Sequence, residues 1–212
     1  MIIHLYAKKL KGELIMRPFN NYDTTQTISA RAQLPVGAYI CQIFKAEEKV
    51  YTSPKGEWHK LEVSFDISEG EHKDFYANDY RAQSGEDKKW KGVLRMNIPT
   101  DDGSEADGWT KRSFKTNILA IEESNNGYHW DWNEAQLKGK TVGIVFRSEE
   151  WEYNGKRGWR TAPFKMVPAA DVKSGNIKMP DPKPLNGKAA SHASTAADLS
   201  DFVEVASADL PF

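Results

Sequence analysis

Cysteine is nearly absent from this sequence of 212 residues, which contains only Cys41. A single cysteine cannot form an internal disulfide, and it has no cysteine neighbours with which to bind zinc. The sequence also lacks an apolar run long enough to cross a bilayer and the pattern of a secretory signal. These absences predict a protein that stays out of the membrane and works in a reducing compartment, the cytoplasm.

Motifs for catalysis and metal binding are missing as well. The sequence has no Gly-rich phosphate loop, no His–Cys cluster and no plausible Ser-His-Asp arrangement. The acidic run 101–107 misses the spacing of a calcium loop, so it predicts a surface loop. His129 is a lone histidine beside Trp130 and Trp132, an arrangement more typical of packing than of catalysis. We expect no enzyme activity, no cofactor and no metal.

The net charge is only −1, with 28% charged residues, which excludes a uniformly basic nucleic-acid coat. The charge is nevertheless unevenly distributed. Residues 189–212 contain four carboxylates and no Lys or Arg, which leaves the remainder near +3. Residues 151–188 alone have eight Lys and Arg against three Asp and Glu. The sequence therefore combines a mildly basic body with an acidic end.

The first fifteen residues differ in pattern from the rest of the chain. A second methionine, Met16, opens a better-patterned stretch, and Lys11-Gly12-Glu13 is the tripeptide that a ribosome-binding sequence would encode in this frame. Two interpretations fit these residues. Either Met16 is the natural start and residues 1–15 are a translated leader, or residues 1–15 form a short N-terminal arm.

Five strands are predicted from the alternation of apolar and polar residues and from turn residues. Asn154-Gly155 strongly favours a two-residue hairpin turn, and Ser53-Pro54-Lys55-Gly56 has the residues of a tight turn. The stretch 75–80 is expected to be irregular. The predicted strands span residues 38–51, 58–67, 90–98, 141–153 and 156–167.

One helix is predicted, over residues 110–124, where Phe114, Ile118 and Ile121 follow the helical spacing. The order of elements is strand, strand, strand, helix, strand, strand. This is the order of an OB fold, a five-stranded Greek-key barrel with a helix between strands three and four. We therefore predict a mainly β protein with an OB-like barrel over residues 16–167.

The strand pattern ends after residue 167. Residues 168–197 are rich in Pro, Gly, Ala and Ser and predict a flexible linker. Residues 198–212 follow as an acidic tail that ends Asp209-Leu210-Pro211-Phe212. We expect the linker to present the tail on a tether.

Aromatic rings and cations alternate near both predicted hairpin turns. Bases stack on aromatic rings while cations follow the phosphates, and each stacked base is worth roughly 1–3 kcal/mol. In the second hairpin, a two-residue turn places four of these residues on one face: Trp151, Tyr153, Lys156 and Arg160. The other face receives Arg157 and Trp159, although a bulge near Gly158 would exchange some of these positions.

The first hairpin offers its own aromatics and cations around the turn, and a third cluster within residues 76–91 extends the track. In an OB fold, the loops between strands one and two and between strands four and five flank the ligand groove. The candidate DNA-binding residues are Tyr51, Lys55, Trp58, Lys60, Tyr80, Arg81, Trp90, Lys91, Arg147, Trp151, Tyr153, Lys156, Arg157, Trp159 and Arg160.

Another interpretation of these residues stays open. Large aromatic side chains are usually buried for packing, so Trp151 and Trp159 could be barrel core with solvated charges around them. The third cluster could equally be a solvated loop.

The C-terminal end resembles the tails of bacterial single-stranded-DNA-binding proteins, which are acidic and end in an Ile-Pro-Phe-like tripeptide. Here the tripeptide has Leu in place of Ile, and the carboxylates are spaced. The tail residues that carry the match are Asp198, Asp201, Glu204, Asp209, Leu210, Pro211 and Phe212. In the body, Gly139-Lys140-Thr141-Val142-Gly143 and Tyr153-Asn154-Gly155-Lys156 are more similar to phage-encoded single-stranded-DNA-binding proteins.

This resemblance implies an OB domain that binds and protects single-stranded DNA during phage DNA replication, recombination and repair, in the cytoplasm of a bacterial host cell. It also implies that the tail recruits phage or host replication and recombination proteins, since Phe212 offers a partner both a ring and the free carboxylate. The acidic tail could also occupy a basic groove when DNA is absent. Homo-oligomerisation is left open.

Three other functions stay open. An RNA-binding regulator would use the same stacking surfaces, because stacking does not distinguish the two sugars. A barrel whose aromatics are core would bind a protein partner and no nucleic acid. A nuclease would hold a metal with some of Asp74, Asp79, Glu149 and Glu150.

Overall fold

The computed structural model describes residues 19–24, 33–54, 56–84 and 86–185. The chain divides into two units, Met1–Ala32 and Gln33–Phe212. In the described part of the first unit, Tyr22–Thr24 forms a short 3₁₀ helix, η1, and the ring of Phe19 meets that of Tyr22 edge to face. The predicted leader, Met16, Lys55 and the whole predicted tail lie outside the described residues.

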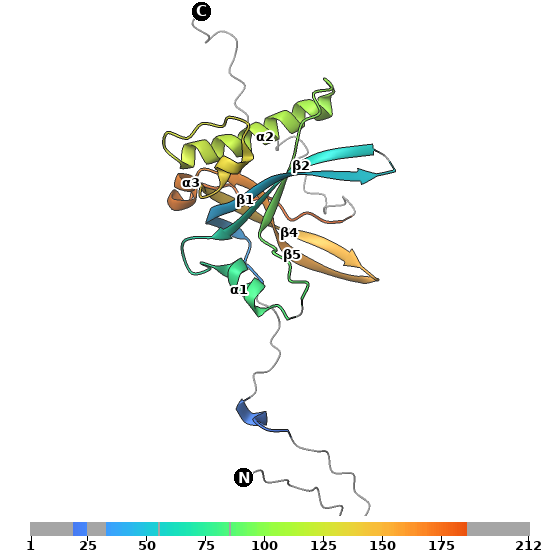
Figure 1. The fold of residues 1–212 in the computed structure, drawn as a ribbon, viewed down its shortest axis with the longest axis vertical. Coiled ribbons are helices and arrows are strands. Elements are labelled where there is room, and N and C mark those ends of the chain that lie inside the picture. The colour runs from blue at the N-terminus through green and yellow to red at the C-terminus, as the bar shows by residue number, and fades with distance from the viewer. Residues whose placement is uncertain (1–18, 25–32, 55, 85, 186–212) are drawn as a thin grey trace, which may run out of the picture. The chain divides into compact units, whose positions relative to one another are not determined.

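The second unit is built on a five-stranded antiparallel sheet, in which the strand order is β3-β2-β1-β4-β5 (Figure 1). The mainly β prediction is therefore confirmed, with five strands. Their bounds are β1 (Gly37–Ser53), β2 (Gly56–Ile67), β3 (Val93–Asn97), β4 (Thr141–Tyr153) and β5 (Lys156–Val167).

The sheet stays open at its two edges. Cα atoms of the edge strands β3 and β5 come within 8 Å of each other. No ladder joins these two strands in the part of the chain that the structure describes. The predicted closed barrel is therefore not confirmed.

The β4–β5 hairpin has the predicted turn and register. Asn154 and Gly155 adopt positive φ angles of 49° and 72°, which a type I′ turn requires, and Tyr153 pairs with Lys156. Gly158 lies opposite Trp151, so the bulge considered near Gly158 is not found. The irregularity in this strand pair lies between Val145 and Phe146 instead.

The hydrophobic core lies on one side of the sheet, where alternate residues of β2 are buried. Phe65 of β2 meets Phe146 of β4 at 6.0 Å between ring centroids. Helix α2 (Glu105–Ser124) adds Ile118 and Ile121 to this core and contacts β3, β4 and β5. In the sequence, α2 lies between β3 and β4, as predicted.

Helix α2 begins five residues before the predicted start at Thr110. Ser104 caps the helix, because its hydroxyl accepts a hydrogen bond from the backbone N–H of Asp107 (3.1 Å). The prediction of a surface loop over residues 101–107 was therefore wrong for its second half. Asp107 is buried in the first turn of α2.

Two further helices occupy stretches that were predicted to be irregular. Helix α1 (Phe75–Ala82) is capped from a distance, because the Asp66 carboxylate of β2 accepts hydrogen bonds from the N–H groups of Tyr76 and Ala77 (both 2.9 Å). Helix α3 (Ala169–Ser174) lies in the predicted linker and packs against Gly143 of β4. A short 3₁₀ helix, η2 (Glu134–Leu137), precedes β4.

The chain beyond α3 returns to β4. The N–H of Lys183 donates to the carbonyl of Ser148 (2.8 Å), and its carbonyl accepts from the N–H of Glu150 (2.9 Å). This single parallel bridge covers β4 beyond Phe146, where pairing with β1 ends. None of the described helices is long and apolar enough to cross a membrane.

Candidate nucleic-acid interface

The side of β1, β2 and β3 that faces away from the core carries aromatic and charged residues. Opposed residues of neighbouring strands share one side of a sheet. The strand register groups eight side chains on this side. We call this surface the outer face. It consists of Glu47, Lys49 and Tyr51 on β1, Trp58, Lys60 and Glu62 on β2, and Arg95 and Asn97 on β3.

Tyr51 and Trp58 form a stacked ring pair at the hairpin end of the outer face. Their ring planes are 11° apart and their centroids are separated by 6.0 Å. Trp58 is 39% exposed, so part of its indole is open to solvent. The Lys60 ammonium lies 5.6 Å from the centre of the Tyr51 ring. An exposed ring pair with a neighbouring cation has the groups that bind a base and its phosphate.

A buried carboxylate, Glu62, anchors the ring pair. It accepts hydrogen bonds from the Tyr51 hydroxyl and from Nε of Arg95 (2.6 Å), while Nζ of Lys49 lies 3.5 Å from its second oxygen. Burial by itself would raise the pKa of Glu62, but the hydrogen bonds and the neighbouring positive charges outweigh it, so the pKa is lowered. The carboxylate is therefore ionised at neutral pH and fixes both Tyr51 and Arg95.

Cations outnumber carboxylates on the outer face. Lys49, Lys60 and Arg95 carry three positive charges against two negative charges on the glutamates. The side chains of Lys49 and Arg95 are about half exposed, while Lys49 pairs with Glu47 (2.8 Å) and Arg95 with Glu62 (2.6 Å). The balance is modest, which suits a surface that combines ring stacking with a few phosphate contacts.

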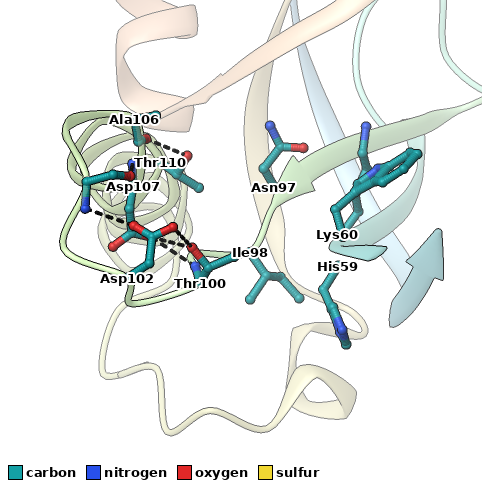
Figure 2. Close-up of a pocket in the computed structure, with 11 residues that line it drawn as sticks. His59, Lys60, Asn97, Ile98, Thr100, Asp102, Ala106, Asp107 and Thr110 are labelled. Carbon is teal, nitrogen blue, oxygen red and sulfur yellow. Dashed lines mark hydrogen bonds between the residues drawn. The ribbon is translucent and has the colours of Figure 1, made fainter. Parts of the chain in front are cut away.

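A pocket of about 390 Å³ adjoins the outer face at the ends of β2 and β3. Lys60 and Asn97 line one side, Ile98 lies between, and the loop that leads into α2 closes the other side (Figure 2). Trp58 is also a lining residue. Asp102 and Asp107 are among the lining residues. Two carboxylates disfavour a phosphate in this pocket.

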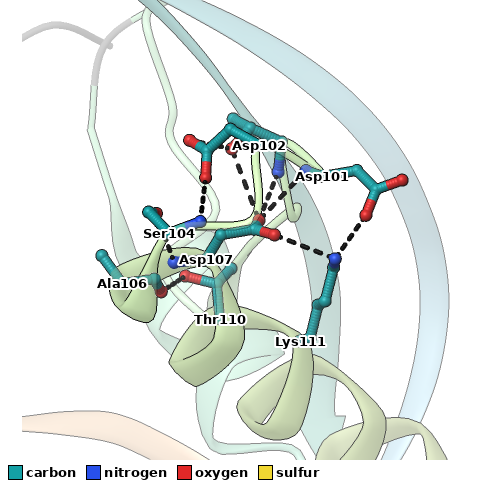
Figure 3. A network of polar contacts seen from close by, with 8 residues as sticks. Asp101, Asp102, Ser104, Ala106, Asp107, Thr110 and Lys111 are labelled. Atoms are coloured by element: carbon teal, nitrogen blue, oxygen red, sulfur yellow. Dashed lines mark hydrogen bonds and ion pairs between the residues drawn. The ribbon is translucent and has the colours of Figure 1, made fainter.

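The acidic side of the pocket is a network that stabilises the start of α2 (Figure 3). The Asp107 carboxylate accepts hydrogen bonds from the N–H groups of Thr100 (2.9 Å) and Asp101 (3.1 Å), and it pairs with Lys111 (3.0 Å). The Lys111 hydrogen bond lowers the pKa of Asp107, although desolvation opposes this. These contacts explain the acidic run as helix capping.

The second hairpin divides its predicted site residues between two faces. Trp151, Tyr153, Lys156, Arg160 and Arg147 share one face, while Arg157 and Trp159 lie on the other, as the register predicted. The Trp151 indole lies against β5, because a Cβ atom at Gly158 would be only 3.0 Å from the ring. Tyr153 is 71% exposed. Trp151 is therefore partly a packing residue, and Tyr153 is open to solvent.

All three arginines of this hairpin contact carboxylates of the same hairpin. Arg157 pairs with Glu152 (2.7 Å), and Glu149 accepts both Arg147 (3.0 Å) and Arg160 (3.4 Å). The Arg147 guanidinium also lies over the ring of Phe164 at 4.0 Å. Their positive charge is therefore partly neutralised, and less of it faces a ligand than the sequence indicated.

The third predicted cluster lies partly on α1 and partly on the irregular segment that follows it, in which Trp90 is held by hydrogen bonds. The Trp90 indole N–H donates to the carbonyls of Phe65 (3.2 Å) and Gly92 (3.0 Å), and the Tyr80 ring lies 5.9 Å from the Trp90 ring. Lys91 pairs with Asp79 (3.2 Å). Arg81 donates to the side chain of Asn78 and to the carbonyl of Ala77, so it is engaged within α1.

Sequence reasoning missed three residues near the outer face. Lys49 lies two positions before Tyr51, and Arg95 two positions before Asn97, so each pair is on one side of its strand and the period of two could have found them. Phe44 contacts the Trp90 ring edge to face at 4.7 Å. No sequence signal predicts that contact, because it depends on a bulge in β1.

The carboxylates considered for a nuclease are not gathered. Glu149 and Glu150 are successive strand residues and point to opposite faces, while Asp74 and Asp79 belong to α1 and its start. Among the described residues, no group of three or more His, Cys, Asp or Glu is placed to hold a metal ion.

A scan against protein-family models finds no match to this sequence, and no curated protein matches it either. The outer face and the two hairpins are therefore the features that support a function.

Proposed function

We propose that this protein binds single-stranded DNA over the outer face, with little sequence preference and without catalysing a reaction. The observation that carries the proposal is the exposed Tyr51–Trp58 ring pair, which Glu62 anchors and which Lys49, Lys60 and Arg95 surround. Every base has a flat π-face, so stacking on such a pair tolerates any sequence.

The strand order supports an OB-like architecture with an open seam. In an OB fold the strands follow one another around the barrel as 1-2-3-5-4, and the ligand lies on strands two and three between two hairpin loops. The order β3-β2-β1-β4-β5 has the same neighbours apart from the closing pair, β3 and β5, which come close without a ladder. The outer face lies on β1, β2 and β3, where such a fold binds its ligand.

The β4–β5 hairpin flanks this surface in our proposal. Tyr153 and Lys156 are exposed at its tip, and Arg160 shares their face. These residues extend the path of a DNA strand that leaves the ring pair, and the charge of Arg160 is partly neutralised by Glu149.

We further propose that residues 198–212 recruit partner proteins of phage or host replication and recombination. The support comes from the sequence, where spaced carboxylates precede a terminal Leu210-Pro211-Phe212. Removing residues 198–212 should abolish recruitment and, if the tail competes for the outer face, tighten DNA binding at low salt. Unchanged recruitment together with unchanged affinity would refute both roles of the tail.

One titration tests the proposal for the outer face. Tryptophan fluorescence is followed while single-stranded DNA, duplex DNA and single-stranded RNA are added at several salt concentrations. Quenching by single-stranded DNA with a clear salt dependence is expected, because stacking and phosphate contacts act together. Tighter binding of RNA than of single-stranded DNA would replace DNA by RNA as the ligand, and no response to any nucleic acid would refute nucleic-acid binding.

A further inference from the structure

A bulge in β1 places an aromatic ring far from the hairpin turn. Ile43 pairs with Phe65 and Lys45 pairs with Ser64, so Phe44 is an extra residue with no partner of its own in the β1–β2 register. Phe65 points into the core, whereas Ser64 and Lys45 lie on the opposite side. Phe44 is 39% exposed and is not part of the buried core.

The ring of Phe44 belongs to a second aromatic group. It meets Trp90 edge to face at 4.7 Å, and Trp90 lies 5.9 Å from Tyr80, which is 38% exposed. The Trp90 indole N–H donates to two backbone carbonyls, so the indole is held in place and supports the two exposed rings. The Lys88 ammonium lies 5.8 Å from the centre of the Tyr80 ring. This group repeats the arrangement of exposed rings with a neighbouring cation.

The two aromatic groups meet β1 at different points, with Phe44 near the middle of the strand and Tyr51 near its hairpin end. Tyr51 lies seven positions after Phe44, which corresponds to about 23 Å along β1 at a rise of about 3.3 Å per residue. Lys45 and Lys49 lie between them and expose about half of their side chains. At about 3.4 Å per nucleotide, this distance corresponds to about seven nucleotides of a stacked strand, and to fewer in a stretched one.

We infer that Phe44, Tyr80 and Trp90 form a second stacking site for the same single strand, and that full affinity requires a strand long enough to reach both aromatic groups. This inference rests on the proposed function. It adds a minimum ligand length to that function and assigns a binding role to Phe44.

Oligonucleotide length separates the two groups in an experiment. Binding of end-labelled oligo(dT) of four and of twelve nucleotides is measured by fluorescence anisotropy for the wild type, Phe44→Leu and Leu119→Ala. The leucine at position 44 keeps apolar contact with Trp90 but removes the ring face. Leu119 is a matched control, because it is also 39% exposed and lies on α2, away from the outer face.

The expected result depends on length. Phe44→Leu should weaken binding of the twelve-nucleotide strand about tenfold, because one stacked base is lost. It should change binding of the four-nucleotide strand by no more than about twofold, because that strand still binds at Tyr51 and Trp58. Leu119→Ala should bind both strands like the wild type.

Three outcomes would overturn the second site. Phe44→Leu could bind the long strand like Leu119→Ala, it could weaken both strands equally, or the wild type could bind both strands with the same affinity. If thermal melting shows that Phe44→Leu is unfolded, Tyr80→Leu decides the question from α1 with the same expected length dependence. If the wild type binds neither strand, the proposed function itself fails, which distinguishes the two ideas.

Discussion

The two hairpins carry similar types of residue around their turns but differ in the strands beside them. Both have two residues between their strands, and both carry aromatics and cations near the tip. The β1–β2 hairpin has β3 as a neighbour, so Arg95 and Asn97 extend its surface. Beyond Phe146, where pairing with β1 ends, the free edge of β4 pairs only with Lys183 among the described residues.

This difference decides how firmly each hairpin holds its rings. Arg95 of β3 and Tyr51 both donate hydrogen bonds to the Glu62 carboxylate, which fixes the Tyr51 ring beside Trp58. Tyr153, at the tip of the other hairpin, is 71% exposed. A ring that is already fixed loses less conformational freedom when a base stacks on it, so the first hairpin is the better organised of the two proposed DNA-binding surfaces.

The largest effect is expected at Trp58. Trp58→Ala should weaken single-stranded DNA binding by about 10- to 100-fold, because a stacked base contributes roughly 1–3 kcal/mol. Trp109→Ala is the matched control, since Trp109 is exposed to a similar extent (42%) but lies on α2. Anisotropy with labelled DNA measures both variants. Equal affinities for the two variants would remove the first hairpin from the interface.

A smaller loss is expected at Arg95, whose guanidinium belongs both to the Glu62 network and to the exposed surface. Arg95→Ala should lower the slope of log affinity against log salt by about 0.7, the value for one phosphate contact on a single strand. Arg112→Ala, on α2, should leave the slope unchanged. A slope that is the same in Arg95→Ala and the wild type would show that Arg95 only positions Tyr51.

In the second hairpin, substitution of Trp151 should affect stability more than binding. Trp151→Ala removes the indole that covers Gly158, and it should lower the free energy of unfolding by about 1 kcal/mol, the upper range for a cross-strand pair. Tyr153→Ala should leave stability unchanged because its ring is largely exposed. Urea unfolding measures both. If Trp151→Ala weakened DNA binding as much as Trp58→Ala, the distinction between the hairpins would fail.

The smallest effect is expected in acid. The pKa of Glu62 is lowered from its ordinary value of 4.5, so its ionised form stabilises the fold above that pH, and this stabilisation disappears as the pH falls through the lowered pKa. Below pH 4.5, the wild type should therefore lose unfolding free energy more steeply than Glu62→Gln. Parallel curves for the two proteins would contradict a role for the ionised carboxylate.

Local patterns were sufficient to predict the strands and one of the hairpins in detail. Asn154-Gly155 fixed the turn, and with a two-residue turn the register of β4 and β5 followed by counting. The apolar spacing of Phe114, Ile118 and Ile121 correctly identified α2. These features depend on residues close together in sequence, which is why the sequence alone could predict them.

Features that depend on distant residues were missed. Helix α1 is capped by Asp66, which lies eight positions before the N-cap residue Asp74. No local capping signal therefore precedes the helix. The start of α2 was missed for a local reason, because Gly108 lowers the helix propensity of its first turns. Whether β3 and β5 close the sheet depends on strand curvature, which the apolar pattern does not encode.

The candidate site was predicted in part for the same reason. Tyr51, Trp58 and Lys60 were named from their position beside a turn, and the register brings them together. Glu62 was interpreted only as a polar residue of an alternating strand, and its contacts with β1 and β3 could not be foreseen. The bulge at Phe44 adds one residue to β1 and leaves no mark in the alternation strong enough to find it.

The pairing of Lys183 with β4 also has a consequence for solubility. An uncovered strand edge presents N–H and C=O groups on which another chain can assemble a continuous sheet, the first step of aggregation. Lys183 covers this edge at Ser148 and Glu150. Pro182 and Pro184 have no N–H groups, so the covering segment cannot itself serve as a template for another strand. A segment that resembles a linker in sequence thus covers part of an edge on which another chain could pair.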